Sequence, residues 1–133
     1  MSPSASADSV VRDYYDALRD GDPLTPYFLE AESTVKFGLS ESLFGADDVA
    51  AALEEQTETT ADWAVESRRL VVDERDAFAT FADDVAMAWT NVDGGERYRF
   101  DSRWSGTLVE RESNEGASDW RFAVMHVSAP HEL

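Results

Sequence analysis

The spacing of the apolar residues changes once along this chain, near Trp63, and no other feature constrains the fold as strongly. Before Trp63, apolar side chains recur every three or four residues, as they do on one face of a helix. After it they alternate with polar side chains, as they do along a strand. Helices followed by a run of strands are typical of an α+β domain and not of a parallel sheet. The 133 residues are enough to bury the core of one such domain.

Three helices are predicted before this change. The first starts near Asp8 or Ser9, either of which can cap it, and ends at Gly21. The pair Asp22-Pro23 predicts a short second helix that reaches about Leu29, because proline fits the first turn of a helix. The third helix is expected over 46–57, with an inner stripe of Val49, Ala52 and Leu53.

Strands are expected over 33–39, 63–72, 78–92, 97–111 and 120–128. Asp93-Gly94-Gly95 predicts a hairpin turn, because glycine adopts the positive φ that tight connections need. A phosphate-binding loop is not indicated there, since no helix follows. Residues 113–118 predict a second hairpin loop. We expect a single domain over 8–130, a disordered N-terminus over 1–7 and a tail over 131–133.

The chain is strongly acidic, because 28 Asp and Glu against 11 Lys and Arg give a formal net charge of −17. The acids lie in short dispersed clusters, which indicates an acidic shell around a folded body. Such a shell repels itself in dilute buffer and is screened over about 3 Å in 1 M salt. Because Lys36 is the only lysine, we interpret the shell as an adaptation to molar intracellular salt. An ordinary acidic protein is the alternative.

The same features bear on partners and location. The negative charge repels a duplex, so no nucleic-acid partner is expected. The first residues lack the basic start and apolar run of a secretion signal, and no segment approaches the roughly 18 apolar residues of a membrane span. The sequence therefore predicts a cytoplasmic protein without a membrane partner. The absence of cysteine excludes disulfides and thiolate metal sites.

Several segments together resemble one known group. These are Val11 to Asp22 (VRDYYDALRDGD), Leu43-Phe44-Gly45, and a C-terminal run from Arg103-Trp104-Ser105-Gly106 to His126-Val127-Ser128-Ala129-Pro130. Over about 8–130 they are similar to the SnoaL-like group of the nuclear-transport-factor-2-like superfamily, here in a halophilic version. The resemblance implies a cone-shaped, cystatin-like roll, in which three N-terminal helices lie on a strongly bent, mainly antiparallel sheet around a hydrophobic cavity. It also implies a homodimer.

The resemblance implies no single activity, because the same cone hosts isomerases, cyclases, dehydratases and non-catalytic subunits. Ketosteroid isomerase chemistry needs a carboxylate base and two acidic donors around an oxyanion. Tyr14 matches the helix-one tyrosine of that family in the Tyr-x-x-Ala-Leu spacing. The base and the second donor fall near Phe37-Gly38 and Phe100, which cannot replace them. This argues against steroid-isomerase chemistry and leaves open a cyclase or dehydratase acting through Tyr14 and His126.

The segment 97–105 carries the clearest alternation. Tyr98, Phe100 and Trp104 share one face, which we expect to lie against the helices. Core packing explains any one of these aromatics, but together they predict a cavity wall. The predicted pocket residues are Tyr14, Phe37, Trp89, Tyr98, Phe100, Trp104 and His126.

The opposite face of the same segment gathers cations in a chain that has few. Arg97, Arg99 and Arg103, with Arg121 on the neighbouring strand, predict a stripe on the outer sheet surface. One interpretation is a dimer face, because arginine is enriched at interfaces where lysine and glutamate are depleted. The other is pairing with local carboxylates such as Asp101 and Glu110.

His126 is the only histidine in the predicted sheet and is expected on the same face as Trp120 and Phe122. A hydrogen-bonded core residue is one interpretation, and an acid–base group is the other. His126 and His131 lack a third ligand at suitable spacing, so no metal and no cofactor are expected. The catalytic residues stay unknown, with Tyr14 and His126 as candidates and no carboxylate assigned as base.

Two hypotheses follow. In one, the chain binds a small apolar ligand in a hydrophobic cone, and an activity of the cyclase, isomerase or dehydratase type stays open. In the other, it is a non-catalytic dimeric module whose cone is filled by side chains. An open interior above roughly 300 Å³ that a tyrosine hydroxyl or imidazole faces favours the first hypothesis.

Overall fold

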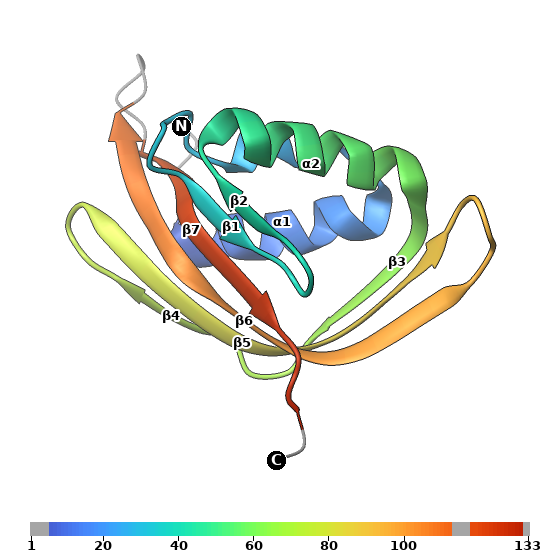
Figure 1. Ribbon diagram of the computed structural model, residues 1–133. Helices are drawn as coiled ribbons and strands as arrows, with labels where there is room; N and C mark the ends of the chain where they lie inside the picture. The colour runs from blue at the N-terminus through green and yellow to red at the C-terminus, as the bar shows by residue number, and fades with distance from the viewer. Residues whose placement is uncertain (1–5, 113–117, 132–133) are drawn as a thin grey trace.

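The computed structural model describes residues 6–112 and 118–131, which form one bent sheet with two α-helices on its concave side (Figure 1). The helices are α1, Ala7–Asp20, and α2, Ala46–Thr59. The predicted α+β class is confirmed. Of the described residues, no helix combines the length and the apolar character that crossing a bilayer requires.

Helix α1 is fixed at both ends by local hydrogen bonds. The Ser6 side chain accepts from the backbone N–H of Ser9 at 3.1 Å, so the helix begins at Ala7, inside the segment expected to be an N-terminal extension. Ala7 is fully buried, and its N–H donates to Glu74 Oε1 at 2.8 Å. Gly21, with φ 72°, ends the helix in the left-handed region, as predicted.

The prediction of a second helix after Gly21 is wrong. Between Gly21 and the first strand there is only a single 3₁₀ turn, Thr25–Tyr27, so the domain has two α-helices and not three. Pro26 follows closely on Pro23, and a proline disfavours helical geometry in the residue before it. The chain is instead held in an extended form, because the N–H of Leu29 donates to the carbonyl of Phe122 at 2.9 Å.

Helix α2 follows the sequence prediction more closely. Asp47 and Asp48 lie in its first turn, where carboxylates interact favourably with the helix dipole. Val49 and Leu53 are buried beneath it, as expected of the inner stripe. The helix ends at Thr59 and passes directly into a strand, without a loop.

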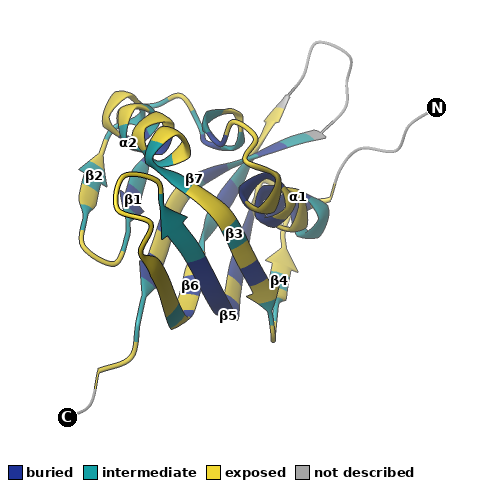
Figure 2. Cartoon of the chain, turned by 90° about the vertical axis from the view of Figure 1, so that its right-hand side faces the viewer, coloured by how far each residue is buried: buried dark blue, intermediate teal, exposed yellow. Residues whose placement is uncertain are grey.

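The sheet has seven strands, and its central members are long. In spatial order they are β2 (Ser42–Phe44), β1 (Val35–Phe37), β7 (Ser118–Ser128), β6 (Arg97–Glu112), β5 (Phe78–Asn91) and β3 (Thr60–Ser67), with β4 (Val71–Glu74) also paired to β5. All pairs are antiparallel except β1 with β7. Buried residues lie mainly on β5, on β7 and on the inner side of α1 (Figure 2).

Two strand predictions differ from the structure. The strand expected over 63–72 is divided into β3 and β4, because the N–H of Arg69 donates to the side-chain oxygen Asp83 Oδ1 and not to a backbone carbonyl of β5. The short strand β2 was not predicted. Three residues are too few to show an alternation.

The hairpin between β5 and β6 is confirmed. Gly95 has φ 75°, and its N–H donates to the carbonyl of Asn91 at 2.8 Å. Residues 113–117 of the second predicted hairpin loop lie outside the described residues. The strands on either side of it, β6 and β7, are paired antiparallel.

A β-bulge at Ala123 reverses the alternation along β7. Thr107 pairs with Val124 but Leu108 pairs with Phe122, so Ala123 is an extra residue on β7. Phe122 is buried on the concave side before the bulge, and Met125 is buried there after it. His126 is therefore exposed on the convex side, and the expectation that it shares a face with Trp120 and Phe122 is wrong.

Candidate ligand cavity

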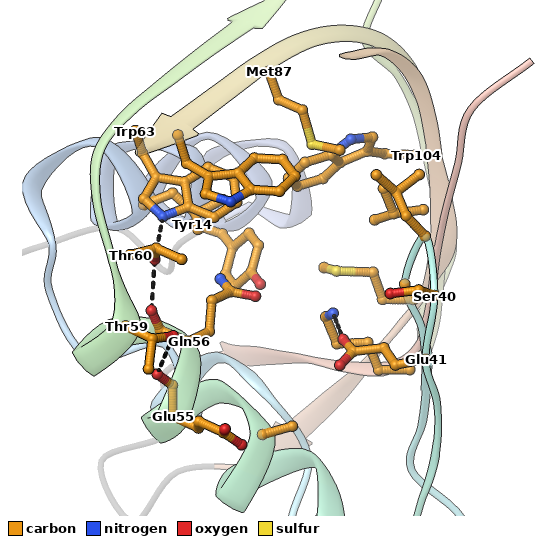
Figure 3. A pocket seen from close by; sticks show the side chains of 18 residues that line it. Tyr14, Ser40, Glu41, Glu55, Gln56, Thr59, Thr60, Trp63, Met87 and Trp104 are labelled. Atoms are coloured by element: carbon orange, nitrogen blue, oxygen red, sulfur yellow. Dashed lines mark hydrogen bonds and ion pairs between the residues drawn. The ribbon is translucent and has the colours of Figure 1, made fainter. Parts of the chain in front are cut away.

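A cavity of about 360 Å³ lies on the concave side of the sheet, between the C-terminal end of α2 and the β1–β2 hairpin (Figure 3). The sheet supplies its apolar wall, made of Trp63, Trp89, Trp104, Met87, Met125 and Val127. The helix end and the hairpin supply its polar wall, made of Lys36, Ser40, Glu41, Glu55, Gln56 and Thr60. Ser40 and Glu55 are exposed and mark the open side.

The aromatic wall is ordered by stacking. The rings of Trp63 and Trp89 are stacked at a centroid distance of 4.9 Å and an interplanar angle of 21°. Phe100 stacks on Trp89 from the next strand at 5.6 Å. Offset stacks of this kind hold flat surfaces rigid, so the wall is suited to a planar ligand.

Trp63 reaches this position through a local irregularity in β3. The pairing of β3 with β5 shifts between Ala61 and Ala64, and Asp62 has a positive φ of 54°. The indole N–H of Trp63 donates to Thr60 Oγ1 at 2.8 Å, which fixes the ring against the end of α2 (Figure 3). The bulge therefore directs Trp63 into the cavity.

Tyr14 lies on the inner side of α1 and is 2% exposed. Its ring makes edge contacts with Phe122 at 5.3 Å and Trp104 at 6.4 Å. Its hydroxyl reaches into the cavity (Figure 3) and has no hydrogen-bond partner among the described residues. Burial raises the pKa of this hydroxyl above its ordinary value, and the charge of Glu41 raises it further, so the hydroxyl stays protonated and can donate a hydrogen bond.

Lys36 and Glu41 form an ion pair across the β1–β2 hairpin. The ammonium Nζ lies 2.9 Å from Glu41 Oε1. Glu41 supplies the cavity with the carboxylate that the sequence could not assign. Lys36, the single lysine of the chain, is the sequence feature that points to this site.

The structure brings three of the predicted pocket residues together. Tyr14, Trp89 and Trp104 line the cavity. Phe37 does not, because inward and outward side chains alternate along β1 and Lys36 takes the inward position. The residues that do not line it are Phe37, Tyr98, Phe100 and His126.

Each of these four residues has an identified place. Phe37 meets His126 on the convex side at a ring distance of 5.7 Å. Tyr98 is 41% exposed near the start of β6, beside Trp89. Phe100 stacks on Trp89 from the neighbouring strand β6 and does not line the cavity.

The predicted arginine stripe lies on the exposed convex side, and three of its members have local partners. Arg99 is 3.7 Å from Asp101, and Arg121 is 2.9 Å from Asp119. Arg97 donates to the carbonyl of Asp62 at 2.9 Å. Arg103 is exposed on the same face. Both interpretations of the stripe, pairing with local carboxylates and a dimer face, therefore stay open. In the part of the chain that the structure describes, no cluster of His, Asp and Glu could hold a metal ion.

Comparisons with known proteins agree with this architecture. A family model described as a SnoaL-like domain matches residues 7–132. A nuclear-transport-factor-2-like superfamily protein from Salmonella enterica superposes with a TM-score of 0.76 at 16% identity, over 93% of this chain and 88% of the other. A Streptomyces avermitilis protein provisionally described as a dehydratase of that family gives 0.77 at 14% identity, over 94% of both chains.

A ketosteroid isomerase-like protein from Erwinia carotovora atroseptica gives a TM-score of 0.67 at 19% identity, over 94% of both chains. At these identities the structures establish the fold and nothing of the activity. Comparison with curated protein sequences finds no match.

Proposed function

The chain belongs to the SnoaL-like domain family, and we propose that it binds a small, flat, largely apolar molecule in the cavity beneath α2. The observation that carries the proposal is the open volume of about 360 Å³ between three tryptophans and the Tyr14 hydroxyl. Small-molecule sites in proteins occupy roughly 300–1,000 Å³ and combine an apolar wall with a few polar groups. A cone filled by its own side chains would leave no such space.

The proposal extends to proton-transfer chemistry of the cyclase, isomerase or dehydratase type. Tyr14 offers a desolvated hydroxyl donor, and Glu41 offers a carboxylate that Lys36 holds in place. A carboxylate can act as a general base, and a hydroxyl that donates a hydrogen bond can stabilise the negative charge that develops on the ligand. His126 has no part in this proposal, because it lies on the convex side.

A cavity-filling substitution tests the binding proposal. Ala52 lines the cavity from α2, whereas its neighbour Ala51 is exposed on the same helix. Ala52→Trp should abolish binding of the uncharged flat probe 2-naphthamide in isothermal titration calorimetry, and Ala51→Trp should leave it unchanged. Circular dichroism checks that both variants fold. Equal binding by Ala52→Trp and the unaltered chain would place the probe elsewhere and refute the proposal.

We also propose the finer features that the sequence suggests. The chain acts in a cytoplasm rich in salt, and it forms a homodimer through the convex face that carries Arg97, Arg99, Arg103 and Arg121. Dispersed acids and a single lysine support the first feature. The exposed cations of β6 support the second. The non-catalytic dimeric module is the competing function, and it would share this face.

A further inference from the structure

Lys36 is a buried cation in the cavity wall. Its side chain is 7% exposed, although lysine is rarely buried because the ammonium loses its hydration. Its Nζ donates to Glu41 at 2.9 Å, the one hydrogen bond that it makes with a described residue. An ammonium has three donors, so two of them are available to a group inside the cavity.

The ammonium of Lys36 is the point in the cavity wall that attracts an anion. Lys36 is the only cationic residue among those that line the cavity, and the two acidic ones are more exposed than it is. Glu41 has 38% of its side chain exposed, so water partly screens its charge. The ammonium acts in a drier place, where electrostatic attraction is stronger. The buried ammonium of Lys36 is thus a local positive charge in a chain with a net charge of −17.

Tyr14 adds a second donor to the same space. Its hydroxyl reaches into the cavity, which Trp63 and Glu41 border from opposite sides (Figure 3). Trp63 lies across the cavity from Glu41 of the β1–β2 turn (Figure 3), and Trp89 stacks on Trp63. A ligand that spans the cavity therefore meets flat aromatic surfaces at one end and the Lys36 ammonium at the other.

Building on the proposed function, we infer that the cavity selects an aromatic anion, a planar ring system that carries a carboxylate or an ionised acidic hydroxyl. The charged oxygen accepts hydrogen bonds from Lys36 Nζ and Tyr14 Oη, and the ring lies against the tryptophan wall. Lys36 is then the residue that determines specificity by charge. The competing explanation is that the Lys36–Glu41 pair only closes the β1–β2 hairpin.

Two probes of equal shape separate these explanations. 2-Naphthoate carries the anion, and 2-naphthamide has the same ring system without charge. The unaltered chain should bind the naphthoate about tenfold more tightly or better, as a charge-assisted hydrogen bond predicts. Lys36→Met should remove that preference, because it weakens binding of the charged naphthoate far more than binding of the uncharged naphthamide. Arg75→Met, which removes an exposed cation far from the cavity, should leave the preference intact.

Two further variants guard against misfolding. The double variant Lys36→Met/Glu41→Leu removes the pair without leaving a lone charge and should also lose the preference. Glu41→Gln removes the carboxylate charge that competes for the ammonium and should strengthen the preference. Equal affinity of the unaltered chain for both probes, or a preference that survives in either Lys36 variant, overturns the inference while the Ala52→Trp effect upholds the proposed function. Failure of both probes to bind refutes both.

Discussion

The hydroxyl of Tyr15 donates a 3.0 Å hydrogen bond to Asp83 Oδ2 and so joins α1 to the centre of β5. Asp83 is 5% exposed, and its two oxygens accept three hydrogen bonds in all. Ser67 Oγ donates to Oδ2 at 2.6 Å, and the backbone N–H of Arg69 donates to Oδ1 at 2.8 Å. One carboxylate therefore connects the first helix with the strands that carry the aromatic wall.

Asp83→Asn should destabilise the fold by about 1–3 kcal/mol. The amide NH₂ of asparagine would replace one of the two carboxylate oxygens, and the group that now donates to that oxygen would lose its acceptor. The free energy of unfolding in urea measures the loss. Asp84→Asn is the matched control, since Asp84 is adjacent and exposed, and it should change stability by less than about 0.5 kcal/mol. Equal effects of the two substitutions would contradict a structural role for Asp83.

Gly106→Ala should destabilise the sheet through steric overlap. A Cβ at position 106 would run into the carbonyl oxygen of Val124 and press on the ring of Phe81. Overpacking of this kind costs about 1–3 kcal/mol. Ser105→Ala, at the next and exposed position, is the control. Thermal unfolding of both variants measures the difference, and a stable Gly106→Ala variant would show that β6 and β7 can separate there.

Stability should fall at alkaline pH because Tyr14 and Tyr15 are buried. Burial raises the pKa of both hydroxyls, and for Tyr15 the charge of Asp83 and the hydrogen bond to it add to the effect. Their contribution is fully present below the unfolded pKa near 10 and is lost as the pH rises towards the higher folded pKa. Each tyrosine adds a slope of up to about 1.4 kcal/mol per pH unit.

Urea unfolding from about pH 9 to about pH 11 measures this loss. Tyr14→Phe removes one of the two titrating groups, so its stability should decline less steeply. A stability that does not change over this range would be inconsistent with two buried neutral hydroxyls.

Lowering the salt concentration should destabilise the chain if its acidic shell is an adaptation to molar salt. Repulsion among the carboxylates grows as screening weakens between about 3 M and about 0.1 M KCl. The melting temperature should therefore fall over this range. A melting temperature that stays level or rises on dilution would favour the ordinary acidic protein.

The chain should have twice its single-chain mass in high salt, as light scattering can determine. The double variant Arg99→Glu/Arg103→Glu reverses two charges on the proposed dimer face and should yield monomers. Arg12→Glu/Arg75→Glu makes the same change in charge on α1 and the β4–β5 turn and should remain dimeric. A monomeric unaltered chain would remove the subunit-interface interpretation.

Much of the secondary structure could be read from local sequence. Gly21 and Gly95 were identified as the end of α1 and the β5–β6 turn because a positive φ at glycine depends on a few neighbouring residues. The alternation along β6 correctly oriented Trp104 towards the helices. The prediction of a short helix after Gly21 was wrong, because Leu29 hydrogen-bonds to Phe122 of β7, which is far along the chain. That contact holds the segment extended despite the local cap signal.

The site was harder to predict for the same reason. His126 was expected on the inner face, but the bulge at Ala123 reverses the alternation just before it. The close approach of Gly106 to Val124 on the neighbouring strand accompanies that bulge, and this relationship joins residues on two strands. No pattern within 118–128 alone discloses it.

The sequence by itself determined the class of fold, the long strands, the turns and the acidic surface, because each depends on periodicity or composition over a few residues. Only the tertiary structure decided that Lys36, Glu41 and Tyr14 meet in one cavity. Their meeting depends on strand register, on a bulge and on the bend of the sheet. These are set by packing between segments that are distant in sequence, so no local pattern encodes them.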